Sequence, residues 1–100
     1  MSAPEIGLKL SRRARADFKY ILQYTGETWG EKQLIVYRDL LAAGLETLRG
    51  APNLGRSHVD LPPTHRVYLV GSHVIVYRML KTTLWVVRIL HQRMSLAQHI

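Results

Sequence analysis

Residues 66–91 read RVYLVGSHVIVYRMLKTTLWVVRILH, and this stretch decides the fold of the chain. It contains three runs rich in β-branched and aromatic residues, which is typical of β-strands; the runs are Arg66–Val70, His73–Leu80 and Leu84–His91. Between the first two runs, Gly71-Ser72 favours a two-residue hairpin turn, and Thr82-Thr83 is a weaker turn signal at the second connection. The stretch therefore predicts a three-stranded antiparallel meander.

The two turns determine which residues share a face of this meander, because side chains alternate along a strand. With Gly71-Ser72 and Thr82-Thr83 as two-residue loops, Tyr77 lies opposite Arg66 on one neighbouring strand and opposite Arg88 on the other. The face expected to form the core carries Val67, Leu69, Val74, Val76, Trp85, Val87 and Ile89. The other face carries Arg66, Tyr68, Ile75, Tyr77, Val86, Arg88 and Leu90.

This second face mixes tyrosine, arginine and aliphatic residues without lysine or glutamate, which is typical of a protein-binding surface. We therefore expect a partner to cover it. Two alternatives stay open. The long loop or the tail could cover this face within the monomer, and a three-residue second turn would reverse the faces of the last strand.

A short strand and an amphipathic helix are expected before the meander. Ile6–Leu10 alternates with period two and predicts the strand. Ser11 follows as a candidate N-cap, and the helix should end near Thr25-Gly26, because glycine is common just past a helix end. The apolar stripe of this helix comprises Ala14, Phe18, Ile21 and Leu22.

A second helix is expected from about Gly30 to Gly50, where Gly50 and then Pro52 stop it. Its buried stripe comprises Leu34, Tyr37, Leu41, Leu45 and Leu48. Gly44 lies inside this helix, where it either permits close approach of another backbone or is simply tolerated. The gap between the two helices is only a few residues, so they should pack as an antiparallel hairpin.

The predicted fold class is α+β: a strand, a two-helix antiparallel hairpin and a three-stranded antiparallel meander, in a single domain of residues 1–100. Residues 51–64 contain three prolines and no periodicity and form a loop, and loops of this length are often functional or attached to the body of the domain. Residues 92–100 form a C-terminal tail, in which Ser95 is a candidate cap for one helical turn.

Composition limits the possible functions. Hydrophobic residues make up 47% and charged residues 21%, as in globular proteins, and the absence of cysteine excludes disulfides and thiolate chemistry. Residues 1–7 lack the features of a signal peptide, and no window is apolar enough to span a membrane, so a cytoplasmic location is expected. The net charge of +7 implies an anionic counterpart: nucleic acid, a membrane surface or an acidic protein.

Few side chains suggest catalysis. The five histidines show no metal-ligand spacing, so neither a metal site nor a cofactor is expected. No acidic residue falls on the meander, which argues against a paired-carboxylate hydrolase. The one plausible enzymatic arrangement is metal-free RNA cleavage by Arg66, Arg88 and His91 with a tyrosine, in which the cations stabilise the reacting phosphate. The plainer interpretation of His91 is a strand-end histidine bonded to a backbone carbonyl.

Several segments occur in the order of one known family. They are Leu10-Ser-Arg-Arg-Ala14-x-x-Asp17, Tyr24-Thr25 followed by Trp29-Gly30, Pro52-Asn-Leu-Gly55-Arg56, Arg66, Gly71-Ser-His73-x-Ile75-x-Tyr77-Arg78 and Arg88-Ile-Leu-His91-Gln-Arg-Met94. The set runs from about Leu8 to Ile100 and resembles the RelE/ParE toxin superfamily, its ParE branch in particular. The expected order of a strand, two helices and three strands in a small basic chain also resembles the order of elements in that superfamily.

The resemblance implies the toxin of a type II toxin–antitoxin pair, which inhibits DNA gyrase and replication and is neutralised by a ParD-type antitoxin in a hetero-oligomer. The C-terminal segment of the antitoxin would wrap the toxin, with acidic residues paired to strand arginines. The expected antitoxin contacts are Leu22, Leu41, Arg66, Tyr68, Ile75, Tyr77, Arg78, Arg88 and Leu90. The expected gyrase contacts lie in the tail: His91, Arg93, Met94 and His99. Neither a membrane partner nor sequence-specific nucleic-acid binding by the toxin alone is expected.

RelE-type relatives supply the alternative function, which is ribosome-dependent cleavage of messenger RNA. The catalytic residues would then be Arg66, Arg88 and His91. The chain departs from that pattern, because no lysine cluster accompanies these residues and no tyrosine follows His91. A non-enzymatic inhibitor of gyrase is therefore favoured, although fold alone does not decide between the two functions.

Overall fold

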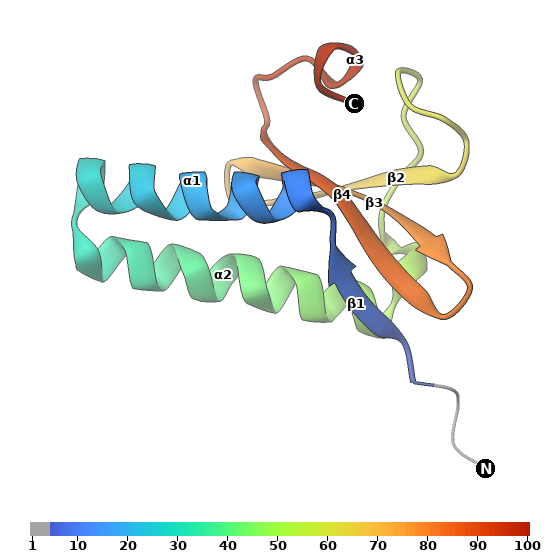
Figure 1. The fold of residues 1–100 in the computed structure, drawn as a ribbon, viewed down its shortest axis with the longest axis horizontal. Helices are drawn as coiled ribbons and strands as arrows, with labels where there is room; N and C mark the ends of the chain where they lie inside the picture. Colours follow the sequence, from blue (N-terminus) through green and yellow to red (C-terminus); the bar gives the residue numbers. More distant parts are fainter. Residues whose placement is uncertain (1–4) are drawn as a thin grey trace.

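The computed structural model describes residues 5–100, and its elements follow the predicted order (Figure 1). They are β1 (Gly7–Leu10), α1 (Arg12–Trp29), α2 (Glu31–Gly50), η1 (Pro52–Leu54), β2 (His65–Val70), β3 (His73–Leu80), β4 (Thr83–His91) and α3 (Leu96–His99). The predicted α+β order of strand, helix hairpin and meander is confirmed. Residues 1–4, which belong to the amino-terminal stretch without signal-peptide features, lie outside the described part. Within that part, no helix combines the length and apolar character needed to cross a membrane.

The predicted N-cap of the first helix is confirmed, and it also joins the helix to the sheet. The Ser11 hydroxyl accepts a hydrogen bond from the Ala14 N–H at 2.9 Å and donates one to the Val87 carbonyl at 2.7 Å. β1, which immediately precedes Ser11, pairs in parallel with β4. The start of α1 is therefore held against β4 by both the strand and the cap.

The first helix continues beyond its expected end near Thr25-Gly26, so that prediction is wrong. Gly26 lies inside α1, where an added Cβ would stand 2.8 Å from Leu34 Cδ1 of α2. This glycine therefore permits close packing of the two helices instead of ending the first. The helix ends at Trp29, and the next residue, Gly30, has a φ of 96°, which lies in the region that favours glycine.

The four strands form one sheet in the order β1-β4-β3-β2. The meander strands β2, β3 and β4 are antiparallel neighbours, as predicted, and β1 adds to β4 in parallel. β1 and β2 are therefore the edge strands. The helix hairpin packs on one side of the sheet, while α3 and the loop between η1 and β2 lie on the side away from α2 (Figure 1).

The first hairpin has the predicted register and the second does not. Val70 pairs with His73 across the two-residue loop, as expected. In the second hairpin Leu80 pairs with Thr83, so the turn is Lys81-Thr82 and not Thr82-Thr83. Lys81 adopts a φ of 56°, and tight two-residue hairpin turns need such positive values.

A β-bulge then shifts the register of the last strand again. Tyr77 pairs with Val86, while the preceding residue Val76 pairs with Arg88, so Val87 is the extra residue. The expected pairing of Tyr77 with Arg88 is therefore wrong. Side chains of the second half of β4 consequently lie on faces that strict alternation from the turn cannot predict.

The assignment of the core face is also wrong. The buried cluster under the helices takes Val70, Ile75, Tyr77, Leu84, Val86 and Ile89 from the sheet, and Ala14, Ile21, Leu41, Leu45 and Leu48 from the helices. Of the residues expected to form the core face, only Ile89 belongs to this cluster. The reason is that both faces are apolar, since Val76 and Leu90 are buried on the side away from the helices. When the residues on both faces of a strand are apolar, the sequence pattern does not show which face the helices cover.

Candidate functional site

The residues expected to form one exposed docking face are divided between two covered faces. Leu41, Ile75, Tyr77, Arg88 and Leu90 are buried, and Leu22, Arg66, Tyr68 and Arg78 are half-buried. Pairing places Arg66 and Tyr68 on the helix side of the sheet, opposite Tyr77 and Ile75, and Arg88 on the other side, opposite Val76. The prediction that one exposed face of the meander carries Arg66, Tyr68, Ile75, Tyr77, Val86, Arg88 and Leu90 is therefore wrong.

Arg88 holds three parts of the fold together. Its guanidinium donates to both carboxylate oxygens of Asp17, at 2.7 and 2.9 Å, and to the His99 carbonyl at 2.7 Å. The same carboxylate accepts a hydrogen bond from the Ile89 N–H at 3.0 Å. The hydrogen bond to Asp17 raises the pKa of Arg88. Arg88 thus joins α1, β4 and the tail.

Arg66 and Tyr77 attach the loop after α2 to the helix side of the sheet. The Tyr77 hydroxyl donates to the Pro52 carbonyl at 2.6 Å and accepts from the Gly55 N–H at 2.9 Å. Arg66 donates to the Gly55 carbonyl at 2.7 Å. Burial raises the pKa of Tyr77, so its hydroxyl stays protonated at neutral pH. Because Arg66 and Arg88 lie on opposite sides of the sheet, the residues suggested for RNA cleavage do not form one site.

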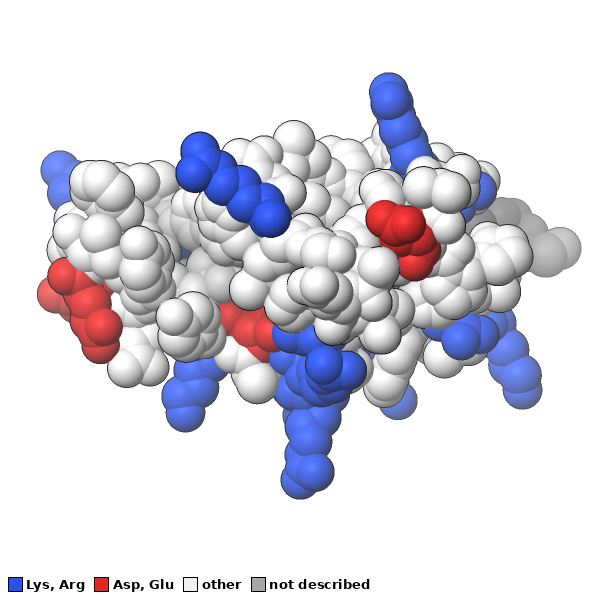
Figure 2. Space-filling model, turned by 90° about the horizontal axis from the view of Figure 1, so that it is seen from above, with Lys and Arg blue, Asp and Glu red and all other residues white. Residues whose placement is uncertain are grey.

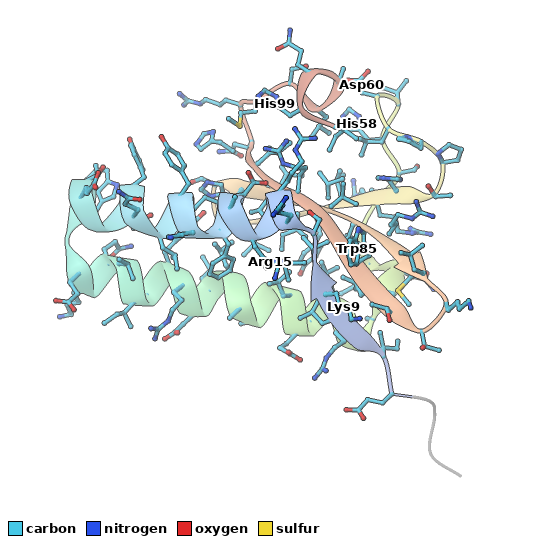
Figure 3. The ribbon with its side chains drawn as sticks, viewed as in Figure 1. Lys9, Arg15, His58, Asp60, Trp85 and His99 are labelled. Carbon is cyan, nitrogen blue, oxygen red and sulfur yellow. The ribbon has the colours of Figure 1, made fainter. Side chains whose placement is uncertain are left out.

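A groove lies beside β1, at the edge of the sheet. It consists of two adjoining cavities of about 510 and 470 Å³ that share Leu10 and Arg15. We name this the β1 groove; its lining residues are Lys9, Leu10, Arg15, Phe18, Lys19, Leu22, Leu45 and Trp85. Figure 3 shows Lys9, Arg15 and Trp85 extending from β1, α1 and β4 around the start of α1. The groove thus combines an apolar floor with a cationic rim.

The charge around the β1 groove has one sign. Lys9, Arg15 and Lys19 line it, and none of its lining residues in the described part of the chain is acidic. Arg78 pairs with Trp85 across the sheet, and within residues 5–100 its buried Nε has no hydrogen-bond partner. Figure 2 shows several basic side chains projecting from one long edge of the molecule, with an acidic patch beside the central ones.

Sequence reasoning found only part of the β1 groove. Leu22 was an expected antitoxin contact, but Trp85 was assigned to the core and the first strand was not considered as a binding edge. The available signal was Lys9, a cation between the apolar Leu8 and Leu10, which places a charge beside a partly buried stripe. The pairing of β1 with β4, which brings Lys9 next to Trp85, is a long-range contact that the sequence does not reveal.

The tail residues expected to contact gyrase lie at the end of β4 and beyond it. His91 ends the strand, and its Nδ1 accepts a hydrogen bond from the Arg93 N–H at 3.2 Å. Arg93 and Met94 are exposed. The predicted helical turn is α3, which Ser95 precedes without a side-chain cap, and the His99 carbonyl is the acceptor for Arg88.

A second cavity, of about 600 Å³, lies between the helix hairpin and the start of β3. We name it the histidine–aromatic cavity; its lining residues are Tyr24, Thr25, Trp29, Gln33, Tyr37, Ser72, His73 and His91. The Tyr37 hydroxyl is hydrogen-bonded to His73 Nδ1 at 2.5 Å and accepts from the Ser72 N–H at 3.1 Å. The rings of His73 and His91 meet edge to face with centroids 5.4 Å apart.

Sequence reasoning missed this cavity, because Tyr37 was assigned to a buried stripe and His73 lay next to a turn. Burial lowers the pKa of His73, and the neighbouring His91 lowers it further. His73 is therefore a neutral imidazole near pH 7. Across residues 5–100, no group of three or more histidines and carboxylates is placed to hold a metal ion.

Relatives among known proteins match nearly the whole chain. The family model described as the ParE toxin of the type II toxin–antitoxin system parDE matches residues 8–96. Toxin ParE1 of Caulobacter vibrioides is 35% identical over 92 residues, which cover 92% of this chain and 95% of the relative. Toxin ParE1 of Mycobacterium tuberculosis is 33% identical over 92 residues, which cover 91% of this chain and 94% of the relative.

A solved structure shares the fold. A chain of the structure described as the chromosomal ParDE TA system from P. aeruginosa matches with a TM-score of 0.75 at 18% sequence identity. The match covers 87% of this chain and 96% of that one. At this level of identity the similarity concerns the arrangement of helices and strands.

Proposed function

The chain belongs to the ParE toxin family of type II toxin–antitoxin systems, and from this membership we propose that it inhibits DNA gyrase and is neutralised by a ParD-type antitoxin. The resemblance to the ParE branch found in the sequence is confirmed. As a ParE-type toxin of a ParDE system, the chain has an antitoxin as its partner in a complex. The toxins of this family are generally binding proteins and not enzymes.

The observation that supports neutralisation by direct binding is the β1 groove. Its floor includes Leu10, Phe18 and Leu22, and its rim carries Lys9, Arg15 and Lys19. An apolar floor with a cationic rim is complementary to an amphipathic segment whose polar face is acidic. β1 is also an edge strand, so its outer backbone groups are available to an added strand. We propose that the C-terminal segment of the antitoxin occupies this groove.

The earlier set of antitoxin contacts changes under this proposal. Leu22 stays a central contact because it lines the β1 groove. Arg66, Tyr68 and Arg78 are half-buried and stay candidate contacts for a segment that wraps the toxin. The remaining members support the surface from within: Leu41, Ile75, Tyr77, Arg88 and Leu90.

We propose that the tail contacts gyrase, through His91, Arg93, Met94 and His99. Arg93 and Met94 are exposed at the end of β4. None of the four tail residues lines the β1 groove. An antitoxin seated in the groove and a target bound at the tail would therefore use different residues. Neutralisation would then work by covering the tail or by changing its position.

The RelE-type alternative, messenger RNA cleavage, receives less support. Arg88 is engaged by Asp17 and the tail, and Arg66 by the loop after α2, on opposite sides of the sheet. Cations that stabilise one pentavalent phosphate must meet at one place. Binding to a protein target is the function that this arrangement favours.

Antitoxin binding is tested by reversing the charge of the groove rim. The double substitution Lys9→Glu and Arg15→Glu should weaken binding of the ParD-type antitoxin by roughly tenfold or more, chiefly by slowing association at low salt. The double substitution Lys32→Glu and Lys81→Glu provides the matched control, because it changes the net charge equally at two exposed lysines that do not line the groove. Surface plasmon resonance at two salt concentrations measures both rates. Equal effects of the two variants would reject the groove as the antitoxin site.

The target is tested by two assays with the same purified toxin. Supercoiling and DNA cleavage by gyrase should respond to the toxin, whereas ribosome-bound message should stay intact. Expression without antitoxin should arrest growth, and coexpression of the antitoxin should restore it. Codon-dependent message cleavage with gyrase unaffected would replace the proposal by the RelE-type function.

A further inference from the structure

The histidine–aromatic cavity is separate from the β1 groove, since the two share no lining residue. It lies between the turn end of the helix hairpin and the sheet, beside His73 at the start of β3 and His91 at the end of β4. Its volume of about 600 Å³ is of the size that small-molecule sites have. The chemistry of its walls indicates what kind of ligand fits.

Two aromatic rings border the cavity and are largely uncovered. Trp29 is 71% exposed and Tyr24 is 56% exposed, although both are large apolar side chains. Trp29 is the last residue of α1, so its position follows from the turn at Gly30 and not from packing in the core. Exposed aromatic faces of this kind are stacking platforms for planar heteroaromatic rings.

The histidines supply hydrogen-bond donors beside these rings. His73 Nδ1 is hydrogen-bonded to the Tyr37 hydroxyl, and His91 Nδ1 accepts from the Arg93 N–H. An Nδ1 that accepts a hydrogen bond carries no proton, so on the His91 ring Nε2 is the donor, and Nε2 of His73 stays open to a ligand. Gln33 also lines the cavity and adds the donors of its side-chain amide. Within the described chain, none of the lining residues is acidic. The cavity therefore suits a ligand with acceptor oxygens next to a flat ring.

We propose that the histidine–aromatic cavity binds one nucleotide, with its base stacked on Trp29 and its phosphate or base oxygens accepting hydrogen bonds from His73 and His91. The nucleotide is either free or one unit of a single-stranded nucleic acid, because both present the same planar base and phosphate. The net charge of +7 favours either source. An acidic peptide fits less well, since a carboxylate alone leaves the aromatic faces uncovered. This binding goes beyond the proposed toxin function and does not depend on it.

The full-length chain is tested with nucleoside monophosphates and with short single-stranded oligonucleotides. The chain has two tryptophans, so Trp85→Phe leaves Trp29 as the only one, and stacking should quench its fluorescence. By titration calorimetry, Trp29→Ala and His73→Ala should each lower affinity by roughly tenfold. Tyr20→Ala is the matched control, because Tyr20 is an exposed aromatic residue of α1 outside the cavity. If His73→Ala fails to fold, the exposed Trp29 and Gln33 still test the site.

The outcomes separate the ligand sources from non-specific attraction. Equal affinity for monophosphates and oligonucleotides identifies a free nucleotide, and binding of oligonucleotides alone identifies a strand. Inorganic pyrophosphate that binds as tightly as a nucleotide, with no effect of Trp29→Ala, would show simple charge attraction and overturn the proposal. Absence of nucleotide binding, or binding of an acidic peptide in its place, would overturn it as well.

Discussion

At the scale of single residues, the strand arginines show how one residue type takes a role that depends on its partners. Arg66 and Arg88 both interrupt apolar runs, which is compatible with binding or with catalysis. Each instead donates to a backbone carbonyl from a distant part of the chain, and Arg88 also to Asp17. A guanidinium has several donors in a fixed fork, so one arginine can join several segments at once. Both therefore act first as structural residues.

Asp17→Ala should destabilise the fold by about 3 kcal/mol, because it leaves the largely buried guanidinium of Arg88 without its carboxylate and removes the acceptor for the Ile89 N–H. Urea unfolding at neutral pH measures the loss. Asp39→Ala is the matched control, since the Arg38–Asp39 pair is exposed and such pairs contribute less than about 1 kcal/mol. Equal losses for both variants would contradict the structural role of Arg88.

Gly44→Ala should also destabilise the fold, by about 1 kcal/mol. An added Cβ would stand 2.7 Å from Val70 Cγ2, so the close approach is to a side chain and not to another backbone. Overpacking costs about 1–3 kcal/mol, and the better helix propensity of alanine offsets about 1 kcal/mol of it. Gly50→Ala, where the Cβ meets nothing within 4 Å, should be neutral or stabilising in the same thermal melts. A Gly44→Ala protein that melts no lower than wild type would refute this packing argument.

At the scale of elements, the sheet is covered on both sides, and this decides what is left for partners. The helix hairpin covers one face, and the tail and the loop after η1 lie on the other side (Figure 1). The two surfaces that we propose for binding therefore lie at the margins: the β1 groove beside an edge strand, and the exposed tail after β4. Only the start of this loop, at Gly55, is held on the helix side of the sheet, by Tyr77 and Arg66.

Truncation after Arg93 should reduce gyrase inhibition and toxicity while leaving antitoxin affinity nearly unchanged. It removes α3 and the carbonyl that Arg88 contacts, but no residue of the β1 groove. Growth arrest, supercoiling inhibition and antitoxin binding are measured on the same variant, with circular dichroism to check folding. The single substitution Met94→Ala tests the tail with α3 in place. Parallel loss of toxicity and antitoxin binding would reject the tail as a separate target surface.

At the scale of the whole molecule, charge and histidine titration govern behaviour in solution. A net charge of +7 accelerates association with an acidic partner, and salt weakens that effect. Stability responds to pH through His65 and His73, which lie in different parts of the sheet. Burial is the main cause that lowers the pKa of both, and Arg78 and His91 respectively add to it.

The free energy of unfolding should fall as the pH drops below about 6.5. The unfolded chain takes up protons on these histidines near their ordinary pKa of 6.5, while the folded chain takes them up only at lower pH. Stability is therefore complete above pH 7 and decreases on acidification, by at most about 1.4 kcal/mol per pH unit for each histidine. Urea unfolding at pH 8.0, 6.5 and 5.5 measures this slope. His73→Gln should make the free energy of unfolding depend less on pH. A protein that is more stable at pH 5.5 than at pH 8.0 would contradict the predicted pH dependence.

Local signals in the sequence determined the order of elements, the family and the register of the first hairpin. Ser11 is recognisable as a cap, Gly71-Ser72 as a turn, and the stripes of both helices as apolar faces, because each depends on residues close together in the chain. The resemblance to the ParE branch likewise depends on ordered short motifs. The proposed contacts Leu22, Arg93 and Met94 come from that resemblance, and they stay predictions.

The tertiary structure alone decided which face of the meander became the core and where the open surfaces lie. Both faces of β3 and β4 are apolar, and the bulge at Val87 changes the alternation, so local pattern could not separate core from cover. The contact of Arg88 with Asp17 and the pairing of Lys9 with Trp85 join segments more than seventy residues apart. Such contacts depend on how the whole chain closes, which short-range periodicity does not encode.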